Sequence, residues 1–193
     1  LYLITPEPAD GSERARRTIA DGVRRAIEGG IRLIQLRAPG LEAGAWHALV
    51  TAVADQAAAS ADCRLLVNAP AAAASDLPPG VGLHLSAAGT RTLRDRPSGP
   101  ERLLGCSCHD ERELAAAEAV GADLAVLGPV APTPSHPEAA GMGWARFADH
   151  AATTTLPLYA LGGVGLQDLD QARAVGAVGV AGIRGLWPDP TAY

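Results

Sequence analysis

Two adjacent glycines, Gly162 and Gly163, end one short apolar run, and Gly182 and Arg184 end the next run along the chain. Glycines leave backbone N–H groups open to an anion, because no Cβ stands in the way. An arginine beside them adds a fork of donors that fits a phosphate or a carboxylate. Together these residues favour a phosphate site, whereas a lone Gly-Gly pair would indicate a plain tight turn.

Polar side chains end three earlier apolar runs in the same way. Gln35 and Arg37 are two residues apart, so their side chains point to one side of a strand, and Arg37 suits either an anionic ligand or a salt bridge at the rim. His109 lies between a strand and a helix, where an imidazole acts as a general acid or base or merely covers the helix start. Asn68 and Ser107 also end strands. We expect these residues to contact the same ligand.

The segment 128–137 contains four prolines and presents Thr133, Ser135 and His136. A stiff loop with polar side chains holds a ligand at little entropic cost. A rigid surface connection explains the same residues equally well. We include the three polar residues among the candidate ligand contacts.

Three other histidines are expected to be structural. His84 lies inside a short strand and is predicted to be a core histidine with satisfied hydrogen bonds rather than a ligand contact. His47 and His150 fall on predicted helices and are expected to face solvent.

The elements that must position these residues alternate along the chain. Short apolar runs and helix-like stretches recur about every 20–25 residues, as in βα units. The predicted strands are residues 1–5, 31–36, 64–67, 82–85, 103–107, 124–127, 158–161 and 178–183. The predicted helices are residues 13–28, 41–59, 110–120, 143–151 and 166–175, with short helices at 71–74 and 90–94. Asp110 is explained as an N-cap, with Glu113 completing a capping-box-like pattern.

Strands that are apolar on both faces belong to a buried parallel sheet. Eight of them predict an α/β fold, a (β/α)₈ TIM barrel, as a single domain over residues 1–193 with its last helix truncated. The alternative is an open doubly wound sheet, but residues 5–8 (Thr-Pro-Glu-Pro) lack its glycine-rich turn. In a barrel the carboxyl ends of the strands converge, so the candidate residues would share one pocket.

Composition narrows the function further. The 193 residues are 48% hydrophobic but only 4% aromatic, which predicts a core of Ala, Val, Leu and Ile. The net charge is −5 and no Lys/Arg run occurs, which disfavours nucleic acid as a partner. No apolar run reaches membrane-spanning length and no signal peptide opens the sequence. Cys63, Cys106 and Cys108 are odd in number and fit no metal spacing, so we expect buried reduced thiols in a cytoplasmic protein.

An ordered set of motifs resembles the thiamine phosphate synthase/TenI family along nearly the whole chain. The matching segments are residues 1–6, 34–37, 66–68, 82–85, 105–109, 121–123, 128–130, 132–133, 160–164 and 176–183. The resemblance implies a (β/α)₈ barrel that handles a thiazole phosphate as a transferase or isomerase. In the synthase it also implies a pyrimidine methyl pyrophosphate and Mg²⁺. The chain is similar to barrels fused behind a Nudix hydrolase domain, which suggests a piece of a longer protein.

The resemblance also implies roles for individual residues. It makes His109 the acid/base of a thiazole tautomerase. It assigns ligand or phosphate contacts to Gln35, Arg37, Ser107, Thr133 and Gly163.

The chain departs from the synthase pattern where charge is needed. Pro39 replaces a lysine, Ala69 replaces an aspartate, His136 replaces a second lysine, and residues 86–89 (Ser-Ala-Ala-Gly) lack an acidic metal ligand. Mg²⁺ prefers carboxylate oxygens, so no metal site is predicted even though the resemblance implies Mg²⁺.

We therefore predict a metal-independent, tautomerase-type proton transfer rather than efficient Mg²⁺-dependent synthesis. His109 would move the proton and Arg37 would clamp the substrate. The alternative is a catalytically degenerate, phosphate-binding accessory domain of a Nudix fusion protein. A phosphosugar-type isomerase on the same barrel rests on fold analogy alone. The predicted partner is a phosphorylated small molecule. A homodimer is kept as an alternative to a monomer.

Overall fold

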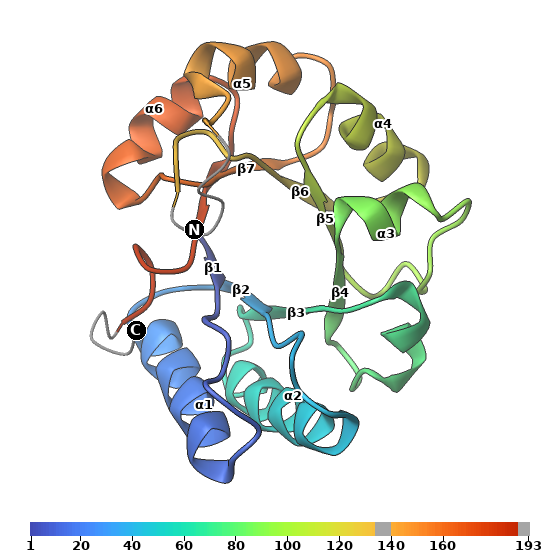
Figure 1. Ribbon diagram of the computed structural model, residues 1–193, viewed down its shortest axis with the longest axis vertical. Coiled ribbons are helices and arrows are strands. Elements are labelled where there is room, and N and C mark those ends of the chain that lie inside the picture. The colour runs from blue at the N-terminus through green and yellow to red at the C-terminus, as the bar shows by residue number, and fades with distance from the viewer. Residues whose placement is uncertain (134–139, 189–193) are drawn as a thin grey trace.

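The computed structural model describes residues 1–133 and 140–188 and contains a closed barrel of eight parallel strands. Each strand pairs with the next along the chain, and β8 (Gly179–Gly182) closes the ring against β1 (Tyr2–Ile4). Viewed down the barrel, the helices surround the ring of strands (Figure 1). The predicted (β/α)₈ barrel is confirmed, and the open doubly wound alternative is wrong.

The elements follow the predicted order, with small shifts at their ends. The other strands are β2 (Leu33–Leu36), β3 (Arg64–Asn68), β4 (Gly82–Leu85), β5 (Leu104–Cys108), β6 (Leu124–Leu127) and β7 (Leu158–Leu161). The helices are α1 (Glu13–Glu28), α2 (Ala43–Ala58), η1 (Ala71–Asp76), α3 (Ala87–Arg91), α4 (Glu111–Ala119), α5 (Gly143–Ala151), η2 (Leu166–Asp168) and α6 (Leu169–Ala174).

The short helix predicted at 90–94 instead spans Ala87–Arg91. Ser86 explains the shift, because its hydroxyl accepts a hydrogen bond from the N–H of Gly89 at 3.1 Å and caps the first turn. The helix predicted over 166–175 is divided into η2 and α6. Within the described chain, β8 leads into a turn at residues 184–186.

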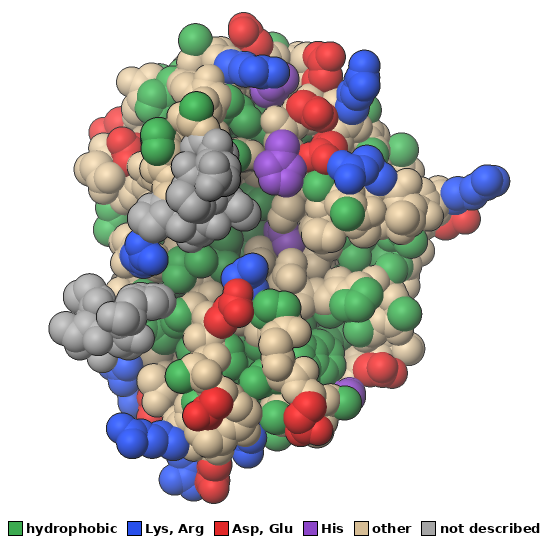
Figure 2. Space-filling model, in the orientation of Figure 1, with side chains coloured by type: hydrophobic (Ala, Val, Ile, Leu, Met, Phe, Trp, Pro, Cys, Tyr) green, Lys and Arg blue, Asp and Glu red, His purple; other side chains and the backbone are tan. Residues whose placement is uncertain are grey.

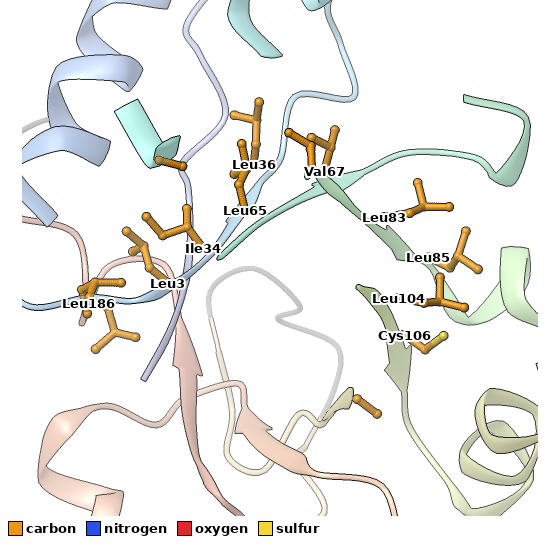
Figure 3. Packing of buried hydrophobic residues seen from close by; sticks show 14 of the residues in the cluster. Leu3, Ile34, Leu36, Leu65, Val67, Leu83, Leu85, Leu104, Cys106 and Leu186 are labelled. Carbon is orange, nitrogen blue, oxygen red and sulfur yellow. The ribbon is translucent and has the colours of Figure 1, made fainter. Parts of the chain in front are cut away.

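Alternation along the strands divides the buried side chains into two layers. Outward-facing residues such as Leu3, Ile34 and Leu83 pack against the helices in the larger cluster, part of which Figure 3 shows. A smaller cluster, with Tyr2, Leu66 and other inward-facing residues, fills the barrel interior. Each strand is therefore packed against helices on its outer face and against other side chains on its inner face. This packing positions the residues at the carboxyl ends of the strands.

The cysteines behave as small buried hydrophobes. Cys63, Cys106 and Cys108 are free and buried, and burial raises the pKa of each thiol above its ordinary value. His47 is exposed as predicted, but the prediction for His150 is wrong, because that side chain is buried. The fully buried Phe147 lies three residues earlier on α5, so both residues share the helix face that packs inward.

No described helix combines the length and the apolar character needed to span a bilayer. The longest of them, α1 and α2, have 16 residues each.

Substituting Gly22 with alanine is expected to destabilise the barrel, although alanine normally favours a helix by about 1 kcal/mol. Gly22 lies in α1, and a Cβ there would stand 2.5 Å from Cη2 of Trp187. Displacing the buried indole costs about 1–3 kcal/mol, and the gain in helix propensity offsets about 1 kcal/mol of that cost. A net loss of about 1 kcal/mol should lower the midpoint of thermal unfolding by about 2–4 °C. Gly44→Ala in α2 is the matched control, because its Cβ would meet only the flexible Glu42 carboxylate, at 3.4 Å. An unchanged midpoint for Gly22→Ala would contradict the prediction.

Candidate functional site

A cavity of about 720 Å³ lies at the carboxyl ends of the strands. On the face drawn in Figure 2, histidine side chains lie at the centre, with blue and red side chains beside them. The predicted site residues that line the cavity are Gln35, Arg37, Asn68, Ser107, His109, Thr133, Gly162, Gly163, Gly182 and Arg184. Ser135 and His136, also predicted, lie outside the described residues.

The loops after β7 and β8 approach each other on one side of this cavity. A Cβ on Gly185 would stand 3.6 Å from the Cα of Gly165, so the two backbones are in contact distance. In the described part of the chain, the N–H groups of Gly163, Val164, Arg184 and Gly185 have no intramolecular acceptor, and all four residues line the cavity. Unpaired backbone donors from two adjacent loops form a concave site suited to an anion.

The Gly162-Gly163 turn is held from behind by the segment after β6. The N–H of Val130 donates to the carbonyl of Leu161, and the N–H of Ala131 donates to the carbonyl of Gly162, each at 2.9 Å. Gly162 and Gly163 have φ of 90° and 68°, a conformation that other residues rarely adopt. The turn is therefore fixed by the carbonyls of Leu161 and Gly162, while the N–H of Gly163 has no acceptor among the described residues.

His109 is held by a buried carboxylate. Its Nδ1 lies 2.7 Å from Oε2 of Glu113, and the same oxygen accepts the backbone N–H of His109 at 2.8 Å. Arg91 pairs with the other carboxylate oxygen. Because an ionised carboxylate only accepts, Nδ1 carries the proton and Nε2 is left as the acceptor. A base oriented by a carboxylate in this way is suited to proton transfer.

Sequence reasoning assigned Glu113 to a capping box and missed this role. Asp110 is the N-cap as predicted, accepting from the N–H of Glu113 at 2.9 Å. Glu113 reaches past the cap to His109 instead of to the N-cap N–H. The spacing of four residues between His109 and Glu113 was the available signal, because a side chain in the first turn of a helix can reach back to the residues just before it.

Replacing Glu113 with glutamine should lower kcat for any reaction that uses His109 as a base. We expect a loss of roughly 20-fold, since the hydrogen bond to a charged group is weakened and the amide can present either its N–H or its oxygen to the imidazole. KM should change less than kcat, because the glutamine does not touch the ligand. Glu118→Gln, on the same helix and away from the cavity, is the control. Equal kcat values for the two variants would exclude an orienting role for Glu113.

Arg37 is engaged within the site. Its guanidinium pairs with the carboxylate of Glu7, and both residues line the cavity. The hydroxyl of Thr5 accepts the backbone N–H of Arg37 at 3.0 Å, which fixes the end of β2. The predicted salt bridge of Arg37 at the rim is therefore present. An anionic ligand that bound Arg37 would have to share or replace Glu7.

Gln35 and Ser107 lie at the two ends of a chain of hydrogen bonds through the barrel. Nε2 of Gln35 donates to the Tyr2 hydroxyl at 3.2 Å, and that hydroxyl is 3.0 Å from Nδ1 of His84. Nε2 of His84 is 3.0 Å from Oγ of Ser107. The prediction of His84 as a satisfied core histidine is confirmed. Sequence reasoning gave no role to Tyr2.

A second hollow, of about 430 Å³, surrounds Glu118 away from the strand ends. Its carboxylate already accepts hydrogen bonds from Thr154 and Thr155. No predicted site residue lines it.

The family model and the curated relatives agree on one family. The family model described as thiamine monophosphate synthase matches residues 1–186. A putative thiamine-phosphate synthase of Geobacter sulfurreducens is 37% identical over 202 residues, covering 98% of this chain and 87% of that protein. The thiamine-phosphate synthase of Roseiflexus sp. is 32% identical over 203 residues, covering 100% of this chain and 80% of that protein.

A solved structure, the thiamine phosphate pyrophosphorylase from Pyrococcus furiosus, has the same fold with a TM-score of 0.74. Its sequence is 21% identical, and the match covers 98% of this chain and 88% of that one.

Proposed function

The chain belongs to the thiamine monophosphate synthase (TMP-TENI) family of thiamine biosynthesis, and from that premise we propose that it is a metal-independent thiazole phosphate tautomerase. The phosphate binds to the N–H groups at the ends of β7 and β8. Arg37 binds the carboxylate of the thiazole, and His109 moves the proton.

The pairing of His109 with Glu113 carries this proposal. With Nδ1–H donated to the carboxylate, Nε2 takes a proton from one position of the bound thiazole and returns it at another. Substrate and product then contain the same atoms, and no co-reactant is needed. The Glu113 carboxylate stabilises the imidazolium that exists between the two transfers, as the carboxylate does in a catalytic triad.

The residues around the cavity do not fit a magnesium ion. Glu7 is paired with Arg37, and Glu113 is paired with His109 and Arg91, so neither carboxylate is open to a cation. Asn68 lines the cavity, but Ala69 follows it, and Ser86 is used as a helix cap. Within residues 1–133 and 140–188 there is no group of three His, Cys, Asp or Glu side chains that could hold a metal. Mg²⁺ requires oxygen ligands and usually carboxylates, so no step of the proposed reaction uses it.

The proposal is tested by following the conversion of a carboxylated thiazole phosphate by NMR, with EDTA in one arm and Mg²⁺ in the other. We expect equal rates in the two arms. A second assay supplies the thiazole phosphate with a pyrimidine methyl pyrophosphate and Mg²⁺, and little thiamine phosphate should form. Turnover that EDTA abolishes, or efficient coupling of the two substrates, would identify a synthase instead.

A second candidate is a phosphate-binding accessory domain without catalysis, such as a barrel joined to a Nudix hydrolase domain. The Glu7–Arg37 pair favours this candidate, because a carboxylate already occupies the guanidinium that a substrate would need. Calorimetry with the thiazole phosphate separates the two candidates. Binding without turnover in both arms would support the accessory domain and contradict the enzyme.

A further inference from the structure

The hydrogen-bond chain through the barrel interior joins groups from four strands. Tyr2 comes from β1, Gln35 from β2, His84 from β4 and Ser107 from β5. Tyr2 and His84 are fully buried, whereas Ser107 lies at the cavity. Polar groups in an interior are costly unless every donor and acceptor is paired, so the order of donors and acceptors along the chain is constrained.

That order follows from the state of each group. Burial raises the pKa of the Tyr2 phenol above its ordinary value, so its proton is retained. The phenol oxygen already accepts from Gln35, and its own proton has Nδ1 of His84 as acceptor, at 3.0 Å. Burial also lowers the pKa of His84 to about 3, so the imidazole is neutral at physiological pH. A neutral imidazole has one donor and one acceptor, which leaves the proton on Nε2.

We infer that the Gln35–Tyr2–His84 chain makes Ser107 a hydrogen-bond donor toward the cavity, so that this part of the site selects an anionic oxygen such as that of a phosphoryl group. Nε2–H of His84 donates to Oγ of Ser107 at 3.0 Å, which turns the hydroxyl proton of Ser107 to the ligand. His84 and Tyr2 act through Ser107 and are positioning residues.

Gly105, the residue of β5 paired with His84, leaves room for the His84 imidazole because it has no side chain. A Cβ at Gly105 would stand 2.6 Å from Nδ1 of His84. Tyr2 is held in turn by an edge-to-face contact with Tyr159, with ring centroids 5.4 Å apart. The ring positions are therefore set by packing as well as by hydrogen bonds. A substitution that removes only the Tyr2 hydroxyl should leave the packing in place.

The inference rests on the proposed function only for the nature of the ligand. The opposite order of donors would place the proton on Nδ1 of His84 and make Ser107 donate inward. An inward-donating serine could offer only its lone pairs, which repel an anionic oxygen. The tautomer of His84 therefore decides whether Ser107 presents a donor or a lone pair to the cavity. This can be tested whether or not the protein converts a substrate.

The first test is nitrogen-15 NMR of the full chain labelled at histidine, with the His84 signals assigned from a His84→Gln variant. We expect the Nε2–H tautomer, unchanged between pH 5 and pH 8. An Nδ1–H tautomer, or titration of His84 within that range, would overturn the inference. Neither result depends on whether the thiazole phosphate is converted, so a failure here is distinguishable from failure of the tautomerase proposal.

The second test measures the affinity for inorganic phosphate by calorimetry in Tyr2→Phe, Ser107→Ala and the double variant. Each single variant should bind about tenfold more weakly, because one hydrogen bond to a charged group is lost or misdirected. The double variant should show no further loss, since both changes act on the same bond. Additive losses, or full affinity in Tyr2→Phe, would overturn the coupling. Tyr159→Phe is the control, because it keeps the ring that packs against Tyr2 and removes a hydroxyl that lies outside the Gln35–Tyr2–His84–Ser107 chain.

Discussion

Replacing His109 with alanine is expected to lower kcat for the proposed tautomerisation about 10³-fold, which is within the range that a positioned general base contributes. The Kd for the thiazole phosphate should stay within about twofold of the parent value, because the backbone donors proposed to bind the phosphate, which have no acceptor among the described residues, come from Gly163, Val164, Arg184 and Gly185. The effect is therefore expected in the chemical step and not in ligand binding.

The matched control is His47→Ala, which removes an exposed imidazole from α2 outside the cavity. Its kcat and its Kd should equal those of the parent protein. Rates are measured by NMR on the thiazole phosphate and affinities by calorimetry on the same samples. If His109→Ala keeps the parent kcat, the proton is moved by another group and the role of the His109–Glu113 pair is structural.

The barrel could be predicted because each of its signals is local. Alternating apolar runs, the stops at Gly29-Gly30 and Gly121, and the cap at Asp110 each depend on a few neighbouring residues. Strand ends of a parallel barrel converge whatever the side chains are. The convergence of Gln35, Ser107 and the glycine turns followed from the fold alone.

The partners of those residues could not be predicted in the same way. Glu7 reaches Arg37 across 30 residues of sequence, and Tyr2 reaches His84 across 82. Such pairs depend on barrel register and on the space that a glycine such as Gly105 leaves, which no local pattern encodes. Glu113 was misassigned for a different reason, because the capping-box pattern and the His109 contact use the same carboxylate.

The described residues bring little net positive charge to the cavity. The Glu7 carboxylate offsets the charge of Arg37, and of the other described residues that line the cavity only Arg184 carries a permanent positive charge. Backbone N–H groups must then supply much of the affinity for a phosphate, through hydrogen bonds that carry no net charge. The site should consequently be sensitive to the backbone conformation at Gly163.

Gly163→Ala should weaken phosphate binding on the order of 150-fold, because about two hydrogen bonds to a charged group are lost at about 1.5 kcal/mol each. Its φ of 68° is unfavourable for alanine. The new Cβ would also stand 2.7 Å from the carbonyl oxygen of Pro132 and 2.8 Å from Cβ of Ala131. Because backbone atoms cannot yield as a flexible side chain does, the turn itself must move, and the N–H groups of Gly163 and Val164 move with it.

Gly30→Ala separates this loss from general strain. Gly30 has a φ of 95°, so alanine is strained there as well, but its Cβ would meet no atom within 4 Å and the residue lies outside the cavity. Gly30→Ala should lose about 1–2 kcal/mol of unfolding free energy in urea, and Gly163→Ala should lose more, because its Cβ also meets backbone atoms. Only Gly163→Ala should lose affinity for inorganic phosphate and for the thiazole phosphate in calorimetry. If Gly163→Ala binds both ligands as tightly as Gly30→Ala does, the phosphate lies elsewhere in the cavity and Arg184 or Arg37 must carry its binding.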